Sequence, residues 1–349
     1  MKKLYLYFFL TITILLLNSC VEEFVNDNYA ERLEKEIPIQ QDTDIIFNGD
    51  YLQFKSLEVY DSICKVLSDM EYEEFQQWES KIGFKSARTW KEKFIDEITN
   101  TDNKEAQEAV TSEYSDKFNY DAKNQIVRYR FFANSLDRVL NIDGYVQIDN
   151  SLYKFTEDNQ YISYDGNKSR IEDALLNNEM KSQEINNDHL LFVKNENSYK
   201  SSNTVALEGI KTVGERRLIY SVNEIIYSTF YAIDPYTGIA WYQWGYGVNL
   251  KMSQEKLNWL NKWKANGALY YLRNMFMYWH EVGIGGPSFD GPIPDKNYTK
   301  KYRTEVTHYF IDVGYIDTYA GSADFAYNLD VTFWSSGITE SNKISISID

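Results

Sequence analysis

The stretch FAYNLDVTFW, residues 325–334, carries the clearest structural signal in the chain. Its odd-numbered positions hold large apolar side chains: Phe325, Tyr327, Leu329, Val331 and Phe333. Its even-numbered positions hold small or polar side chains, with Trp334 as the exception. A period of two residues is that of a β-strand with one apolar face. The stretch therefore predicts a strand that is buried on one side.

The same alternation recurs on both sides of this stretch. It runs through residues 217–223, through 309–313 and through the terminal 344–348. Several alternating strands with no crossover helices between them favour antiparallel pairing. We therefore predict an antiparallel, β-sandwich-like region over residues 201–349.

Residues 256–279 fit two patterns. Trp259 and Trp263 have helical spacing, whereas Gly267 and the aromatic content suit strands. We expect strands there, because aromatic residues pack well on a pleated surface.

Upstream of residue 200 the apolar residues first follow helical spacing. Stripes run through Leu57, Tyr60, Ile63, Cys64 and Leu67, through Tyr72, Phe75, Trp78 and Ile82, through Trp90, Phe94 and Ile98, and through Tyr129, Phe132, Leu136 and Leu140. From Gly144 onward, short alternating segments separated by turn residues predict hairpins. The chain is thus predicted to be α+β, with a helix-rich region and small β-hairpins over residues 47–200.

The first 19 residues resemble a bacterial lipoprotein signal. Lys2 and Lys3 precede an apolar run from Leu4 to Leu17, which is short for a membrane span of about 20 residues. The run ends at Leu17-Asn18-Ser19-Cys20, which resembles a lipobox, although Asn18 departs from its usual small residue. The resemblance implies a lipid on Cys20 and anchoring in the outer membrane. The alternatives are an uncleaved anchor or an ordinary cleavage that leaves Cys20 free.

Residues 20–46 are acidic and polar, and we expect a flexible tether there. Val21-Glu22-Glu23 resembles the surface-export signal of lipoproteins from the Bacteroides group, which implies exposure at the cell surface. A Ser- and Asn-rich break at residues 195–203 is the candidate boundary between the two folded regions.

Further motifs resemble lipoproteins of the gut Bacteroides group that have no assigned activity. The resemblance rests on Phe54-Lys55-Ser56, on Trp78-Glu79, on Gly83-Phe84-Lys85-Ser86 and on Asn141-Ile142-Asp143-Gly144-Tyr145-Val146. It covers about half of the chain, and it implies a location rather than a reaction.

Charge and cysteine content narrow the possible partners. The net charge is -16, and loss of the two signal lysines makes it -18 in the mature chain. Such a chain repels phosphate backbones, so we expect no nucleic-acid partner.

The two cysteines are Cys20 and Cys64, and a lipid on Cys20 leaves no intramolecular disulfide. Cys64 lies on an apolar helical stripe, which favours a buried thiol.

No catalytic motif is complete. His280-Glu281 lacks the histidine that a zinc protease needs at position 284. Residues 165–176 resemble the start of a calcium loop, but Arg170 stands where the loop needs glycine and Leu176 where it needs glutamate. There is no nucleophile elbow, phosphate loop or dinucleotide fingerprint. We therefore name no catalytic or metal-binding residue and expect no cofactor.

Two tryptophans lie on the polar side of their predicted strands. Trp241 shares its face with Gln243, and Trp334 shares its face with Asn328 and Asp330. Sugar rings stack on such side chains while nearby amides and carboxylates bind the hydroxyls. We hypothesise that these residues bind a glycan or a protein. The alternative is that a helix or loop covers both tryptophans, which would make them a second small core.

The sequence leaves three functions open. The first is a non-enzymatic outer-membrane lipoprotein that binds a glycan or another envelope protein. The second is an extracellular polysaccharide hydrolase, and the third is a structural envelope protein. A cleft rich in carboxylates would favour the hydrolase, and an exposed aromatic platform would favour binding.

Overall fold

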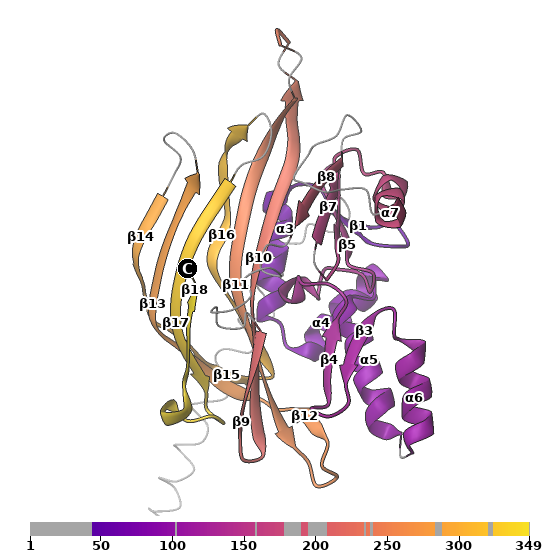
Figure 1. Ribbon diagram of the computed structural model, residues 1–349, viewed down its shortest axis with the longest axis vertical. Coiled ribbons are helices and arrows are strands. Elements are labelled where there is room, and N and C mark those ends of the chain that lie inside the picture. The colour runs from indigo at the N-terminus through magenta and orange to yellow at the C-terminus, as the bar shows by residue number, and fades with distance from the viewer. Residues whose placement is uncertain are drawn as a thin grey trace, which may run out of the picture. The chain divides into compact units, whose positions relative to one another are not determined.

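Ten β-strands make up most of the described chain beyond residue 200 (Figure 1). Their bounds are β9 Glu208–Val213, β10 Arg216–Ile233, β11 Ala240–Leu257, β12 Trp263–Ala265, β13 Ala268–Val282, β14 Ser288–Ile293, β15 Lys296–Arg303, β16 Glu305–Tyr319, β17 Asp324–Ser335 and β18 Ile344–Ile348. They form two five-stranded sheets. One has the order β12-β11-β10-β9 with β16 also paired to β11, and the other has the order β14-β13-β17-β18 with β15 also paired to β13.

The computed structural model describes residues 44–101, 103–157, 159–177, 190–194, 208–233, 235–237, 240–282, 288–319 and 324–348. Every pairing within the two five-stranded sheets is antiparallel. The strands predicted at 217–223, 309–313, 325–334 and 344–348 are confirmed, and β12 and β13 confirm the preference for strands within 256–279.

One apolar cluster contains side chains from both sheets. It includes Leu218, Val222, Leu250 and Met252 from the first sheet and Leu272, Leu329, Val331 and Phe333 from the second, all buried. The odd-numbered residues of 325–334 thus bury the face that their alternation predicts. On β11, Leu250 and Met252 point into this cluster, so Lys251 and Ser253 lie on the opposite face of the sheet.

A third sheet belongs to the first half of the chain. Its strands are β1 Ile45–Phe47, β2 Leu52–Phe54, β5 Tyr145–Ile148, β6 Ser151–Phe155, β7 Asn159–Ser163 and β8 Leu190–Lys194, paired in that order. Only the β2–β5 pairing is parallel among these strands. A separate hairpin joins β3 Phe118–Asp121 to β4 Ile126–Tyr129. The hairpins predicted after Gly144 are confirmed.

Five α-helices are described, all before residue 178: α3 Leu57–Asp69, α4 Tyr72–Ile82, α5 Ala87–Asn100, α6 Lys104–Glu113 and α7 Lys168–Asn177. Ser86 caps α5 by accepting a hydrogen bond from the Thr89 backbone N–H, at 3.2 Å. The mixed α+β class is confirmed. Within the described residues, no helix is long and apolar enough to cross a membrane.

The helix predicted from Tyr129 to Leu140 is wrong. Strand β4 ends at Tyr129, and only the short 3₁₀ turn η1 Asn134–Leu136 follows. The backbone N–H of Phe132 donates to the Thr156 carbonyl, 3.0 Å away, so a distant strand replaces the helical partner. Helix α6 is the opposite case: the sequence does not predict it, because the helix carries no buried residue and its sequence shows no apolar stripe.

Residues Ile45–Asp349 form one compact unit. The predicted signal, Cys20 and nearly all of the tether lie outside the described residues, as does the break at 195–203. The boundary between 200 and 201 therefore stays a prediction.

Candidate functional site

The polar face of the first five-stranded sheet carries a row of charged and hydroxyl side chains. Ser253 of β11 lies directly opposite Glu305 of β16, and Lys251 lies opposite Ser221 of β10. Glu305 is 7% exposed and Ser221 is buried as well. Other parts of the protein therefore cover this face of the sheet, although its polar side chains are of the kind usually found on a solvent-exposed face.

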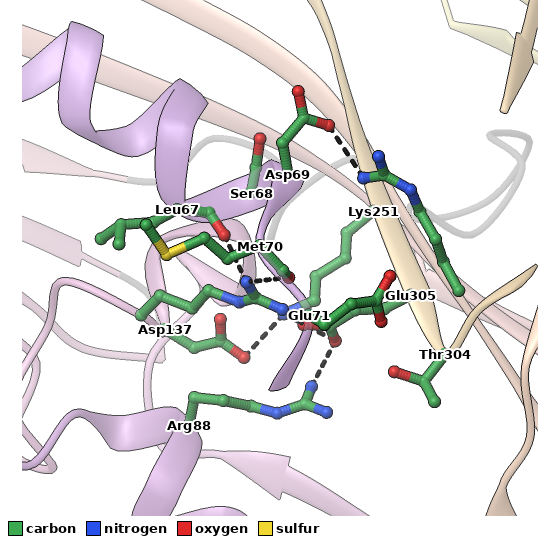
Figure 2. Close-up of polar contacts among 12 residues, drawn as sticks. Leu67, Ser68, Asp69, Met70, Glu71, Arg88, Asp137, Lys251, Thr304 and Glu305 are labelled. Atoms are coloured by element: carbon green, nitrogen blue, oxygen red, sulfur yellow. Dashed lines mark hydrogen bonds and ion pairs between the residues drawn. The ribbon is translucent and has the colours of Figure 1, made fainter. Parts of the chain in front are cut away.

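Glu305 is the centre of a buried ion network (Figure 2). Arg88 of α5 donates to one of its carboxylate oxygens, and Arg138 donates to the other at 2.9 Å. The Lys251 ammonium lies 3.5 Å from Glu305. Burial alone would raise the pKa of Glu305, but Arg88, Lys251 and Arg138 outweigh it and hold that pKa well below its usual range. The carboxylate is therefore ionised in the folded protein.

Asp137 is the second carboxylate of this network. It accepts hydrogen bonds from the Lys251 ammonium at 2.6 Å and from the Tyr129 hydroxyl at 2.8 Å. Arg138 also donates to the carbonyls of Leu67 and Met70 at the end of α3, which Figure 2 shows beside the network. The Met70 backbone N–H already donates to the Leu67 carbonyl at 3.2 Å, so Arg138 adds a second donor there and supplies one to the Met70 carbonyl.

A cavity of about 400 Å³ adjoins the ion network. Its lining comes from α5, from the β3–β4 hairpin, from β9 to β11 and from the β12 hairpin, and it includes Arg88, Lys91, Ile95, Tyr129, Ser253 and Trp263. Arg217 fixes the hairpin to the sheet, because its guanidinium donates to the carbonyls of Asn124 and Gln125. The cavity thus has walls from rigid elements that are distant in sequence.

Lys91 is the unusual residue of this cavity. It is partly buried, and its ammonium lies 4.8 Å from the centre of the Tyr129 ring. It forms neither a hydrogen bond nor a salt bridge with any residue that the structure describes. Burial lowers the pKa of Lys91, and the nearby charges of Lys251 and Arg88 lower it further.

Three other groups in the lining have spare hydrogen-bonding capacity. Arg88 is 8% exposed, and its Nε atom has no hydrogen-bond partner among the described residues. Ser253 shows no side-chain hydrogen bond within the same part of the chain. The Oε1 atom of Gln254 accepts hydrogen bonds from the Ser335 hydroxyl and the Gly337 backbone N–H, while its buried Nε2 atom has no partner there.

Cys64 is buried and free, as the helical stripe predicts. Burial is the main cause that raises its pKa to about 12. The thiolate, which is the nucleophilic form, is therefore scarce at neutral pH. Among the described residues, no three His, Cys, Asp or Glu side chains are grouped so as to hold a metal ion.

The hypothesised glycan-binding residues lie on two different sheets. Trp334 is 8% exposed and stacks on Tyr271, with ring centres 5.2 Å apart. Asn328 and Asp330 are exposed on the same strand, β17. Trp241 is partly buried on β11, and the Gln243 side chain lies outside the described part of the structure. No contact between Trp241 and Trp334 is described.

The sequence analysis did not single out Lys91, Arg88 or Glu305. A signal for the first two existed on α5, where Arg88 and Lys91 share a helical face with Ile95 and Ile98. Two cations on an otherwise apolar stripe indicate a polar partner on the facing element. Glu305 offers no such signal, because its role depends on strand pairing.

Comparison with known proteins finds structural similarity alone. No family model matches the chain, and no curated protein matches it. The chain is similar to the crystal structure of a DUF4848 family protein from Bacteroides thetaiotaomicron, with 14% sequence identity and a TM-score of 0.31, over 87% of this chain and 98% of that chain.

Proposed function

We propose that this protein is an outer-membrane lipoprotein, anchored through Cys20, that binds a carbohydrate in the cavity beside α5 without catalysing a reaction. The observation that carries the proposal is the cavity itself. Its volume of about 400 Å³ lies within the roughly 300–1,000 Å³ that small-molecule sites occupy. Its aromatic side chains, such as Trp263, suit the C–H faces of a sugar, and Ser253 and Lys91 suit its hydroxyls.

The pairing of the acidic residues in the lining favours binding over hydrolysis. Glycoside hydrolysis needs a carboxylic acid that keeps its proton until it meets the substrate. The carboxylates here each lie beside a cation, in the pairs Glu92–Arg88 at 2.8 Å, Asp96–Lys264 at 3.7 Å, Glu208–Arg128 at 3.4 Å and Glu255–Arg217 at 2.5 Å. Each of these four carboxylates is thus engaged by a cation of the protein, and none in the described lining is left unpaired to act on a substrate.

We further infer that the two five-stranded sheets pack as a sandwich-like scaffold, because their side chains share one apolar cluster. The sheet faces that carry Trp241 on β11 and Trp334 on β17 stay alternative locations for the ligand. The cavity and these faces make different predictions for variants, so one experiment separates them.

The experiment measures retention of the purified protein on a panel of host and dietary glycans. Ile95→Trp fills the cavity and should abolish retention, whereas Ile46→Trp, at a side chain that is 51% exposed, should not. Loss of retention in Trp241→Ala, with Ile95→Trp unaffected, would move the site to the alternative surface. Failure of the parent protein to bind any glycan would refute the proposed function.

A further inference from the structure

We infer that the ligand of this cavity is a sugar that carries a carboxylate, and that Lys91 binds the carboxylate. The inference rests on the proposed function and adds the chemical class of the ligand. It begins from a contrast among the cations around the cavity. Lys91 contacts no carboxylate or carbonyl among the described residues. The other cations of the lining do: Arg88, Arg128, Lys251 and Lys264 each contact a carboxylate of the protein, and Lys262 donates to the Thr99 carbonyl.

The carboxylates close to Lys91 already have partners. Glu92 contacts the Arg88 guanidinium at 2.8 Å. Asp137 accepts hydrogen bonds from Lys251 and Tyr129. Neither is placed to neutralise the Lys91 ammonium directly, although both attract it at longer range. The Tyr129 ring supplies a cation–π contact, which stabilises an ammonium less than a desolvated counter-ion does.

A cation held away from bulk water without a counter-ion is unfavourable unless something compensates it. An anion that enters the cavity would provide that compensation, and it would form a charge-assisted hydrogen bond. Because Lys91 lines the cavity, the ligand can supply this anion without any rearrangement of the ion network around Glu305.

The number of unpaired cations selects the kind of anion. Among the cations of the described lining, Lys91 is the one with neither a carboxylate nor a carbonyl partner. One unpaired charge matches the single charge of a carboxylate. A phosphate dianion is usually bound by several cations or by a row of backbone N–H groups. The Ser253 hydroxyl is left for a sugar hydroxyl.

The test is calorimetric titration with uronic-acid di- and trisaccharides, each paired with its methyl ester and with the corresponding neutral sugar. The ester keeps the shape of the sugar and removes its charge. We expect the acid to bind the parent protein at least about tenfold more tightly than its ester. Lys91→Met should remove this preference, so that the variant binds the acid and its ester equally. Lys93→Met is the matched control, since its side chain is 51% exposed on the same helix.

The outcomes separate the inference from the proposed function. If neutral sugars bind the parent, Ile95→Trp blocks them and acids bind no better, the proposed function stands and the carboxylate inference fails. Unchanged acid binding in a folded Lys91→Met variant overturns the inference as well. If no saccharide of any kind binds the parent, both fail. Thermal unfolding of each variant shows whether it is folded.

Discussion

The guanidinium of Arg88 and the carboxylate of Glu305 are 217 residues apart in the sequence and form a buried ion pair. Arg88 lies in the first turn of α5, and Glu305 is the first residue of β16. The pair therefore joins the helical part of the chain to the first five-stranded sheet. Arg138 and Lys251 converge on the same carboxylate, so Glu305 contacts three cations, two of which also contact Asp137 or Glu92.

Glu305→Gln should destabilise the protein strongly. The amide keeps the shape of the side chain but removes its charge, which leaves buried cations with too few counter-ions. Removing one partner of a buried pair typically costs about 3–5 kcal/mol. Denaturant unfolding of parent and variant measures the difference. As a control, Glu108→Gln removes a carboxylate that is 67% exposed and should cost less than about 0.5 kcal/mol. Equal stability of the two variants would contradict this account.

The same carboxylate makes part of the stability depend on pH. The pKa of Glu305 is lowered in the folded state, so its contribution is fully present above the unfolded-state pKa of about 4.3 and is lost as the pH falls through the folded-state pKa. The stability gap between parent and Glu305→Gln should be constant between about pH 5 and 8 and shrink below about pH 4. Denaturant midpoints across that range measure the gap. A gap that stays constant or widens as the pH falls below about 4 would show that the folded-state pKa of Glu305 is not lowered.

The sequence predicts the strands far better than it predicts the cavity. Residues 325–334 alternate because one face enters the shared apolar cluster, and that rule needs no knowledge of the neighbours. The same rule identifies the polar face that contains Lys251, but it does not show what covers that face. That face is covered because α5 and the segment around Asp137 bring charges that match those of the sheet.

The residues around Tyr129 show how tertiary contacts outweigh local spacing. Tyr129, Phe132, Leu136 and Leu140 have helical spacing, yet Tyr129 stacks on Phe131 with ring centres 4.7 Å apart, and Phe132 packs on Phe155 at 5.6 Å. Tyr129 and Phe132 pack against different partners, so one amphipathic helix cannot satisfy both. The cavity around Lys91 is missed for a related reason. Strands form part of its walls, and the apolar pattern of α5 does not show which strands face the helix.

Trp334→Ala should lower stability by about 3–5 kcal/mol, because the Trp334 side chain is almost fully buried against Tyr271. Trp259→Ala is the matched control, since this tryptophan is 88% exposed and its loss should change stability by no more than about 0.5 kcal/mol. Thermal and denaturant unfolding give both values. The opposite result, unchanged stability with lost glycan retention, would support Trp334 as a ligand-binding residue.

Cys20→Ala should abolish lipid attachment. We expect the variant to incorporate no labelled palmitate and to move from the membrane fraction to the soluble fraction, because a lipid-anchored protein without its lipid has lost its attachment. Metabolic labelling and cell fractionation measure the two effects. Cys64→Ala is the control, since this thiol is buried within α3 and should not be acylated. Palmitate labelling that persists in Cys20→Ala would rule out the lipobox.

Lys91→Met should stabilise the protein at neutral pH and stop doing so in alkali. The pKa of Lys91 is lowered in the folded state, so folding disfavours its charged form. That penalty is fully present below the folded-state pKa and is relieved as the pH rises from there to the unfolded-state pKa of about 10.4. Methionine carries no charge, so the variant should unfold about 1–3 °C higher than the parent at pH 7.

The measurement is the difference in unfolding midpoint between Lys91→Met and the parent from pH 6 to pH 10.5. Taking a difference cancels the titration of groups common to both proteins. The charged groups that act on Lys91 are Arg88, Glu92, Asp137 and Lys251, and all are present in both. Lys93→Met should show no such pH-dependent gain, since Lys93 pairs with Glu97 at the surface. A Lys91→Met variant that is less stable than the parent at pH 7 would show that Lys91 has a stabilising partner, and the ligand would then not be needed to neutralise it.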